Sequence, residues 1–184
     1  MEHIAILGQA GAGKSWLARE LAEALDVPVI HLDRLYWKPG WVPMPEPEWE
    51  ALQRREIGRA SWIADGLQEE RAMPELWLEA ADTIVFLDAS PLSCIWRVTR
   101  RRLGGEAGPE APADCEPAPF YLAFPKFLRF LWLYERRVRP KILAELDRRR
   151  ASQQVAVLRS EHEVGTFLAN MKAQRAALGE SLLT

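Results

Sequence analysis

The fold of this protein follows from one stretch near its start: Gly8-Gln9-Ala10-Gly11-Ala12-Gly13-Lys14-Ser15. These residues match the phosphate-loop pattern G-x-x-x-x-G-K-[ST] at every fixed position. The glycines allow backbone N–H groups to surround a polyphosphate without clashes from Cβ atoms. Lys14 is expected to reach the β- and γ-phosphates, and the Ser15 hydroxyl is expected to bind Mg²⁺. The stretch, extended to Trp16, therefore predicts a binding site for ATP and magnesium.

The residues on either side of this stretch agree with that interpretation. Residues 4–7 form a short apolar run typical of a buried parallel strand, and residues 16–25 carry apolar side chains at helical spacing. Phosphate binding needs this order of strand, loop and helix, because the helix N-terminus supplies unpaired N–H donors and the positive end of a dipole. The alternative is a chance glycine turn between a strand and a helix.

Length and composition indicate a single globular domain over residues 1–184. Of its 184 residues, 48% are hydrophobic and 27% are charged, and the net charge is −2. This charge gives no attraction to nucleic acid, so direct nucleic-acid binding is not expected. No apolar run reaches membrane-spanning length, and we expect neither a signal peptide nor membrane association. Two cysteines cannot form a disulfide framework or a zinc site alone, so a cytoplasmic protein is expected.

Further apolar runs alternate with helical patterns along the chain. The predicted strands are residues 4–7, 29–32, 61–64, 83–87 and 155–158. Helices are expected near residues 46–59, 68–79, 90–102, 120–133 and 163–178. The helix at 120–133 should break at Pro125, and a further short helix should end at Arg149. The result is an α/β fold, a parallel sheet covered by helices on both faces. Residues 104–119 contain Gly, Ala, Pro and acids without apolar periodicity, and predict a short lid at about 103–120.

Three carboxylates follow predicted strands, at the edge where ligands of such sheets bind. Asp65 and Asp88 are each either a magnesium ligand or a turn residue, and periodicity does not decide between them. Asp33 is either a group that accepts the proton of a substrate hydroxyl or a loop cap paired with Arg34. His31 is interpreted as a strand residue rather than a catalyst.

Arginines follow the fourth predicted strand. Arg97 and Arg101 stand four residues apart and so share one helix face. They either stabilise charge on the γ-phosphate or form a solvated basic face. Arg139, with its neighbours 136 and 137, flanks the far end of the lid and suggests the same role. We expect Arg34, Trp37 and Arg71 to bind the second substrate, which accepts the phosphoryl group. Arg71 would bind an anionic group on it.

With these features in place, the chain resembles the adenylate-kinase-like P-loop kinases, and most closely the bacterial DNA topology modulation proteins. The matching segments are residues 8–15, 31–37 with 39–41, 62–66, 82–88, 97–102, 139–142 and 157–160. The block Leu-Asp-Arg-Leu-Tyr-Trp followed by Pro-Gly-Trp is the most specific of them.

The resemblance implies a three-layer P-loop fold whose five parallel strands lie in the order 2-3-1-4-5. It also implies that Asp65 is the magnesium-side acid, so we interpret Asp88 as structural. Arg97, Arg101 and Arg139 are implied to be the phosphate-binding arginines. Two features depart from the family. The family commonly has Asp-Gly-Asn-Tyr after the third strand, where this chain has Asp-Gly-Leu-Gln, and its lids contain arginines that this one lacks.

The sequence thus predicts a magnesium-dependent kinase that transfers the ATP γ-phosphoryl group to a nucleoside monophosphate or a hydroxylated metabolite. Two alternatives remain open at this point. The protein could be a nucleotide-binding regulatory factor associated with DNA topology, or a slow ATPase in which water replaces the acceptor.

Overall fold

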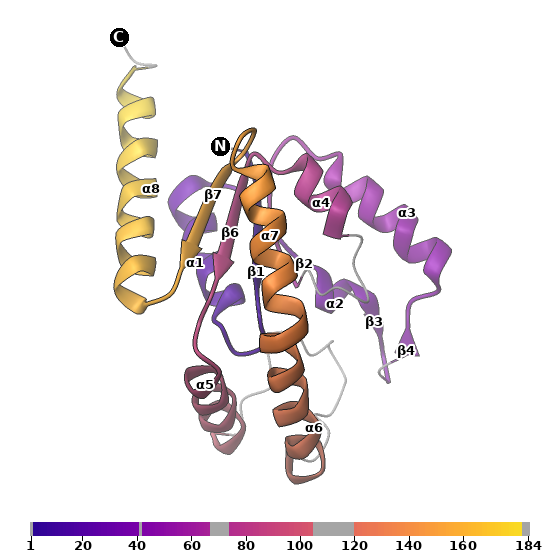
Figure 1. Ribbon diagram of the computed structural model, residues 1–184. Helices are drawn as coiled ribbons and strands as arrows, with labels where there is room; N and C mark the ends of the chain where they lie inside the picture. Colours follow the sequence, from indigo (N-terminus) through magenta and orange to yellow (C-terminus); the bar gives the residue numbers. More distant parts are fainter. Residues whose placement is uncertain (1, 41, 67–73, 105–119, 182–184) are drawn as a thin grey trace.

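A computed structural model describes residues 2–40, 42–66, 74–104 and 120–181 of the chain (Figure 1). Its centre is a five-stranded sheet in the order β2-β5-β1-β6-β7 with every pair parallel. The strands are β1 (His3–Gly8), β2 (Val29–His31), β5 (Trp62–Asp65), β6 (Thr83–Leu87) and β7 (Gln154–Leu158). Counted along the chain within this sheet, the order is 2-3-1-4-5, which confirms the predicted fold class.

Helices cover both faces of the sheet, because alternate residues of each strand pack in opposite directions. Ile4 and Ile6 of β1 join a core with α1 (Lys14–Leu25) and α8 (Glu161–Ser181). Ala5 and Leu7 join a second core with α3 (Glu46–Ile57), α4 (Pro74–Ala80) and α7 (Arg139–Arg149). These two cores and the sheet between them form the three layers that Figure 1 shows.

Most of the described tryptophans lie either in the second core or on the surface. Trp62 and Trp77 are fully buried and meet edge to face, with ring centroids 4.9 Å apart. Trp49 is also buried there, whereas Trp16, Trp96 and Trp132 are exposed. Trp49, Trp62 and Trp77 therefore serve packing in the second core.

The segment after β2 forms regular structure although it contains prolines and a glycine. It forms the short helix α2 (Leu32–Tyr36) and a two-stranded hairpin of β3 (Trp37–Lys38) and β4 (Val42–Pro43). Met44 N donates to the Tyr36 carbonyl at 2.9 Å, and the Tyr36 ring packs on Trp49 at 5.3 Å. Aromatic contact with α3 thus orders a segment whose prolines and glycine suggested irregular backbone.

The helical region before β7 also differs from the prediction. Helix α6 (Phe120–Leu133) runs through Pro125 without a break and continues through the π-helix η1 (Tyr134–Val138) into α7. Pro125 removes a single backbone N–H, and this loss alone does not end the helix. The predicted lid falls mainly on residues 105–119, which lie outside the described residues. Within the described ranges, no helix is long and apolar enough to span a membrane.

Asp88, directly after β6, contacts residues of two other segments. Its carboxylate accepts from Arg139 Nε at 2.6 Å and Nη2 at 2.8 Å, and lies 3.3 Å from Arg159 Nε. The hydrogen bonds and charge of Arg139 lower the pKa of Asp88 below its usual value, against the opposing effect of burial. Asp88 thus connects the end of β6 to the start of α7 through Arg139, and to the residue after β7 through Arg159.

We predict that Asp88→Asn destabilises the protein by about 2 kcal/mol at pH 7, because the charge-assisted hydrogen bonds are weakened. Since the pKa is lower in the folded state, this contribution is complete above about pH 4 and is lost as the pH falls further. As the pH falls below about 4, the free energy of unfolding should therefore decrease less steeply in the variant than in the wild type. Urea unfolding across pH measures both effects. Asp147→Asn, in the exposed pair with Arg150, is the control, and equal effects of the two variants would contradict the prediction.

Candidate functional site

The phosphate loop connects β1 to α1 and ends at Lys14, the first residue of that helix. Gly11 has a φ of +82°, which side chains rarely allow. Lys14 is buried, and its Nζ donates to the Gln9 carbonyl at 3.2 Å. Ser15 is buried beside it, and the described residues offer its hydroxyl no hydrogen-bond partner. The loop therefore has the backbone and the two side chains that a phosphate site needs.

The segment from β6 into α5 (Pro91–Leu103) packs against the phosphate loop and hydrogen-bonds to it. A Cβ on Gly11 would lie 2.7 Å from the Cys94 carbonyl oxygen. Gln9 Nε2 donates to the Ala89 carbonyl at 2.8 Å, and Arg97 Nη1 donates to the Ala12 carbonyl at 3.1 Å. Cys94 is fully buried, and burial raises the pKa of its thiol. Sequence reasoning missed the supporting roles of Gln9 and Cys94, since the phosphate-loop pattern leaves position 9 unspecified.

Asp65, at the end of β5, is buried next to His31 at the end of β2. The two residues are paired in the parallel register, and His31 Nδ1 lies 2.7 Å from Asp65 Oδ1. No other described residue hydrogen-bonds to this carboxylate. Both β5 and β6 flank β1, so adjacency to the first strand does not separate Asp65 from Asp88. Their partners do, because Asp88 is held by two arginines and Asp65 is not.

The donor set fits magnesium. Ser15 and Asp65 supply a hydroxyl and a carboxylate, which are hard oxygen ligands, and each has an oxygen without a partner among the described residues. No cluster of three or more His, Cys, Asp and Glu suited to a metal occurs in the described ranges.

Asp33 lies in α2 rather than in a loop, and it is buried beside the residue after Asp65. A Cβ on Gly66, where φ is +83°, would lie 2.9 Å from Asp33 N and 3.0 Å from its Oδ2. The backbone thus places the Asp33 carboxylate against Gly66. Arg34 is exposed and Trp37 is partly exposed, whereas Arg71 lies outside the described residues.

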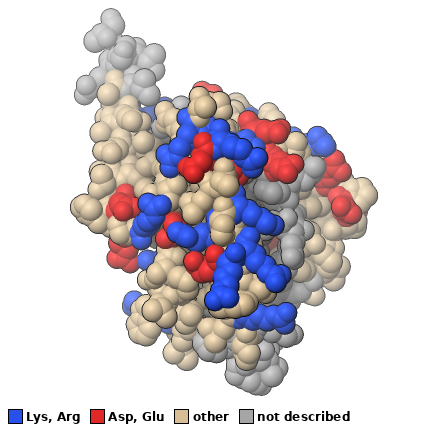
Figure 2. All heavy atoms as spheres, viewed as in Figure 1, with Lys and Arg blue, Asp and Glu red and all other residues tan. Residues whose placement is uncertain are grey.

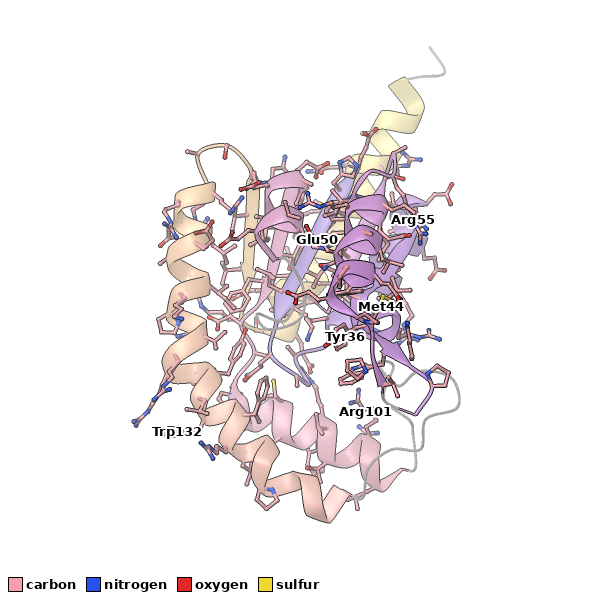
Figure 3. All side chains as sticks on the ribbon, turned by 90° about the vertical axis from the view of Figure 1, so that its right-hand side faces the viewer. Tyr36, Met44, Glu50, Arg55, Arg101 and Trp132 are labelled. Atoms are coloured by element: carbon pink, nitrogen blue, oxygen red, sulfur yellow. The ribbon has the colours of Figure 1, made fainter. Side chains whose placement is uncertain are left out.

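The three predicted phosphate-binding arginines have different surroundings. Arg97 bridges the Ala12 carbonyl and Glu161, at 3.1 and 3.0 Å. Arg139 is engaged by Asp88. Arg101 has a buried Nε without a hydrogen-bond partner among the described residues. Figure 3 shows Arg101 on the side of α5 that faces Tyr36 and Met44. Of the three arginines, Arg101 is therefore the one without an ion pair in the described part of the chain.

Comparison with known proteins adds evidence on the fold. No protein-family model matches the sequence, and no curated protein matches it either. A gluconokinase from Sinorhizobium meliloti 1021 is similar in structure, with 18% identity, a TM-score of 0.52, and coverage of 99% of this chain and 95% of that one. The chain has the P-loop kinase fold. An unliganded sugar kinase from Janibacter sp. HTCC2649 has 16% identity and a TM-score of 0.49, with 92% and 93% of the two chains covered.

Within this P-loop kinase fold, the carboxyl ends of β2, β5 and β1 gather several of the predicted site residues at one edge of the sheet. They are Lys14, Ser15, Asp33 and Asp65, with Arg97 in contact with the phosphate loop. Arg139 contacts Asp88 beyond β6, on the other side of β1.

We predict that Gly11→Ala weakens ATP binding about tenfold or more, because the new Cβ would meet a main-chain oxygen and φ would be strained, costing about 2 kcal/mol. Calorimetric titration with ATP measures the loss. Gly58→Ala is a suitable control, since φ there is −74° and a Cβ makes only ordinary contacts from 3.5 Å. ATP affinity equal in both variants would show that the close approach to Cys94 does not matter.

Proposed function

We propose that the protein is a magnesium-dependent kinase that transfers the ATP γ-phosphoryl group to a hydroxyl group of a small acceptor. One observation carries the proposal: the buried pair Lys14 and Ser15 lies at the same sheet edge as the buried carboxylates of Asp33 and Asp65. A phosphate loop alone indicates nucleotide binding. A second buried carboxylate beside it supplies a group that can accept the proton of an acceptor hydroxyl.

Each residue has the role that its side-chain chemistry allows. Backbone N–H groups of the loop and Lys14 hold the ATP phosphates, and Arg101, with Arg97, stabilises charge that develops on the transferred group. Ser15 and Asp65 hold Mg²⁺, which neutralises charge on the phosphate oxygens. Asp33 orients the acceptor hydroxyl and takes its proton. Catalysis then rests on positioning and electrostatic stabilisation.

The charge of the acceptor side favours a hydroxylated molecule over a nucleoside monophosphate. Asp33 is a buried carboxylate close to Asp65, so a phosphate group brought next to it would meet like charge. A hydroxyl group, by contrast, can donate to the carboxylate. A gluconokinase shares the fold. A polyhydroxylated acceptor would offer Asp33 a hydroxyl group that can donate to its carboxylate.

Other parts of the sequence-based hypothesis also belong to this proposal. These are the membership in the adenylate-kinase-related topology modulation group, and the lid at about residues 103–120 with Arg71 near the acceptor. Direct DNA binding is not part of it. Figure 2 shows a band of Lys and Arg side chains over α7 and η1 with acidic side chains among them. Several of these arginines are paired with Glu145 or Asp147, which reduces the field available to a polyanion.

We predict that Lys14→Ala lowers phosphoryl transfer at least about 10²-fold, because a preorganised charge at the phosphates is removed. The fold should persist, since Lys14 makes one hydrogen bond to a main-chain carbonyl. ADP release in the presence of acceptor measures the rate, and circular dichroism checks the fold. Lys172→Ala, on the exposed side of α8, serves as control. An unchanged rate in the Lys14 variant would refute the proposed function.

We predict that Asp33→Asn lowers acceptor-dependent turnover by about 10²- to 10⁴-fold, because the amide cannot take the hydroxyl proton. ATP affinity should be unchanged, as Asp33 lies on the acceptor side. A panel of sugars, sugar acids, nucleosides and nucleoside monophosphates identifies the acceptor class. Preferred transfer to monophosphates would contradict the argument from charge. ATP turnover that is equal with and without every acceptor would instead indicate an ATPase.

A further inference from the structure

The ring of His31 makes the single side-chain hydrogen bond that the described residues give to Asp65. The distance from Nδ1 to Asp65 Oδ1 is 2.7 Å, and the side chains are 22% and 4% exposed. A carboxylate oxygen is an acceptor, so His31 Nδ1 carries the proton and donates it. The contact is short, shielded from solvent and charge-assisted.

Main-chain geometry builds this contact into the sheet. Strands β2 and β5 pair His31 with Asp65 in parallel register, and paired side chains of parallel strands point to the same face. The preceding pair, Ile30 with Ala64, packs in the second core on the opposite face. A shift of one residue in register would bury His31 in that core and separate it from Asp65. The sheet therefore fixes which side chain accompanies Asp65.

One oxygen of Asp65 is thus fixed, and the other has no hydrogen-bond partner among the described residues. An aspartate has two free side-chain torsions, and a hydrogen bond to one oxygen restricts both of them. Carboxylates that bind metals are commonly oriented in this way, and loss of the orienting group typically costs 10- to 100-fold in metal affinity.

We propose that His31 is a positioning residue for the metal site: by donating from Nδ1 to Asp65 Oδ1, it holds the second oxygen ready for Mg²⁺. The inference rests on the proposed function, because it requires that Asp65 serve the metal of a MgATP complex. His31 acts through Asp65 and needs no contact with nucleotide or acceptor.

A purely structural role makes a different prediction. Strand β2 has three residues and pairs with β5 at the edge of the sheet, so the hydrogen bond could serve only to fasten this strand. Removing it would then lower stability and weaken ATP binding equally with and without metal. A positioning role affects only the part of ATP affinity that magnesium adds.

Calorimetric titration of the full chain with ATP, once with excess Mg²⁺ and once with EDTA, separates the two roles. The ratio of the two affinities gives the gain due to metal. His31→Asn keeps an N–H donor close to the position of Nδ1, whereas His31→Gln moves it to that of Nε2. We expect His31→Ala and His31→Gln to lose about 10- to 100-fold of this gain. We expect His31→Asn and the exposed control His162→Ala to keep most of it, and all variants to bind ATP equally in EDTA.

The inference is overturned if His31→Ala keeps the full gain, or if its affinity falls equally in Mg²⁺ and in EDTA. If the alanine variant does not fold, the comparison of His31→Asn with His31→Gln decides, and equal gains in these two would also overturn it. Wild-type protein that binds ATP without any gain from Mg²⁺ refutes the positioning role and leaves the phosphate loop intact. Wild-type protein that binds no ATP refutes the proposed function itself.

Discussion

The phosphate loop lies so close to the first turns of α5 that no Cβ fits between Gly11 and the carbonyl of Cys94. Hydrogen bonds from Gln9 to the Ala89 carbonyl and from Arg97 to the Ala12 carbonyl hold the loop on either side of this contact. Helix α5 also carries Arg101. One packing contact therefore sets both the shape of the loop and the position of the arginine that faces the site, because packed interiors transmit displacement.

Parallel register is the second constraint on the site. It pairs His31 with Asp65, and Gly66, the next residue, lies against Asp33. Two carboxylates are thereby buried near each other, which costs free energy unless cations or hydrogen-bond donors compensate. His31 supplies one donor. In the proposed complex with MgATP, a cation bound to Asp65 would add to this compensation, so the cost of burial and the proposed metal site favour the same partner.

The sequence predicted the strands and the phosphate loop because both depend on local signals: apolar runs, turn residues and a fixed motif. It could not reveal the pairing of His31 with Asp65 or of Asp88 with Arg139, since periodicity carries no information on register or on contacts 34 and 51 residues apart. The hairpin of β3 and β4 was missed because each strand has two residues. Packing of Tyr36 on Trp49, rather than propensity, orders that segment.

The strength of existing contacts indicates which cations can move to a phosphate group. Lys14 donates to a neutral carbonyl, and Arg97 to a carbonyl and to Glu161, whose side chain is 89% exposed. Release of Arg97 from Glu161 costs little, because exposed pairs contribute at most about 1 kcal/mol. Its Nη1 can meanwhile keep the hydrogen bond to the Ala12 carbonyl. Arg139 is different: its release would deprive the buried Asp88 of its bidentate partner, at a cost of several kcal/mol. We therefore infer that Arg97 and Arg101 serve the phosphates, whereas Arg139 holds the end of β6.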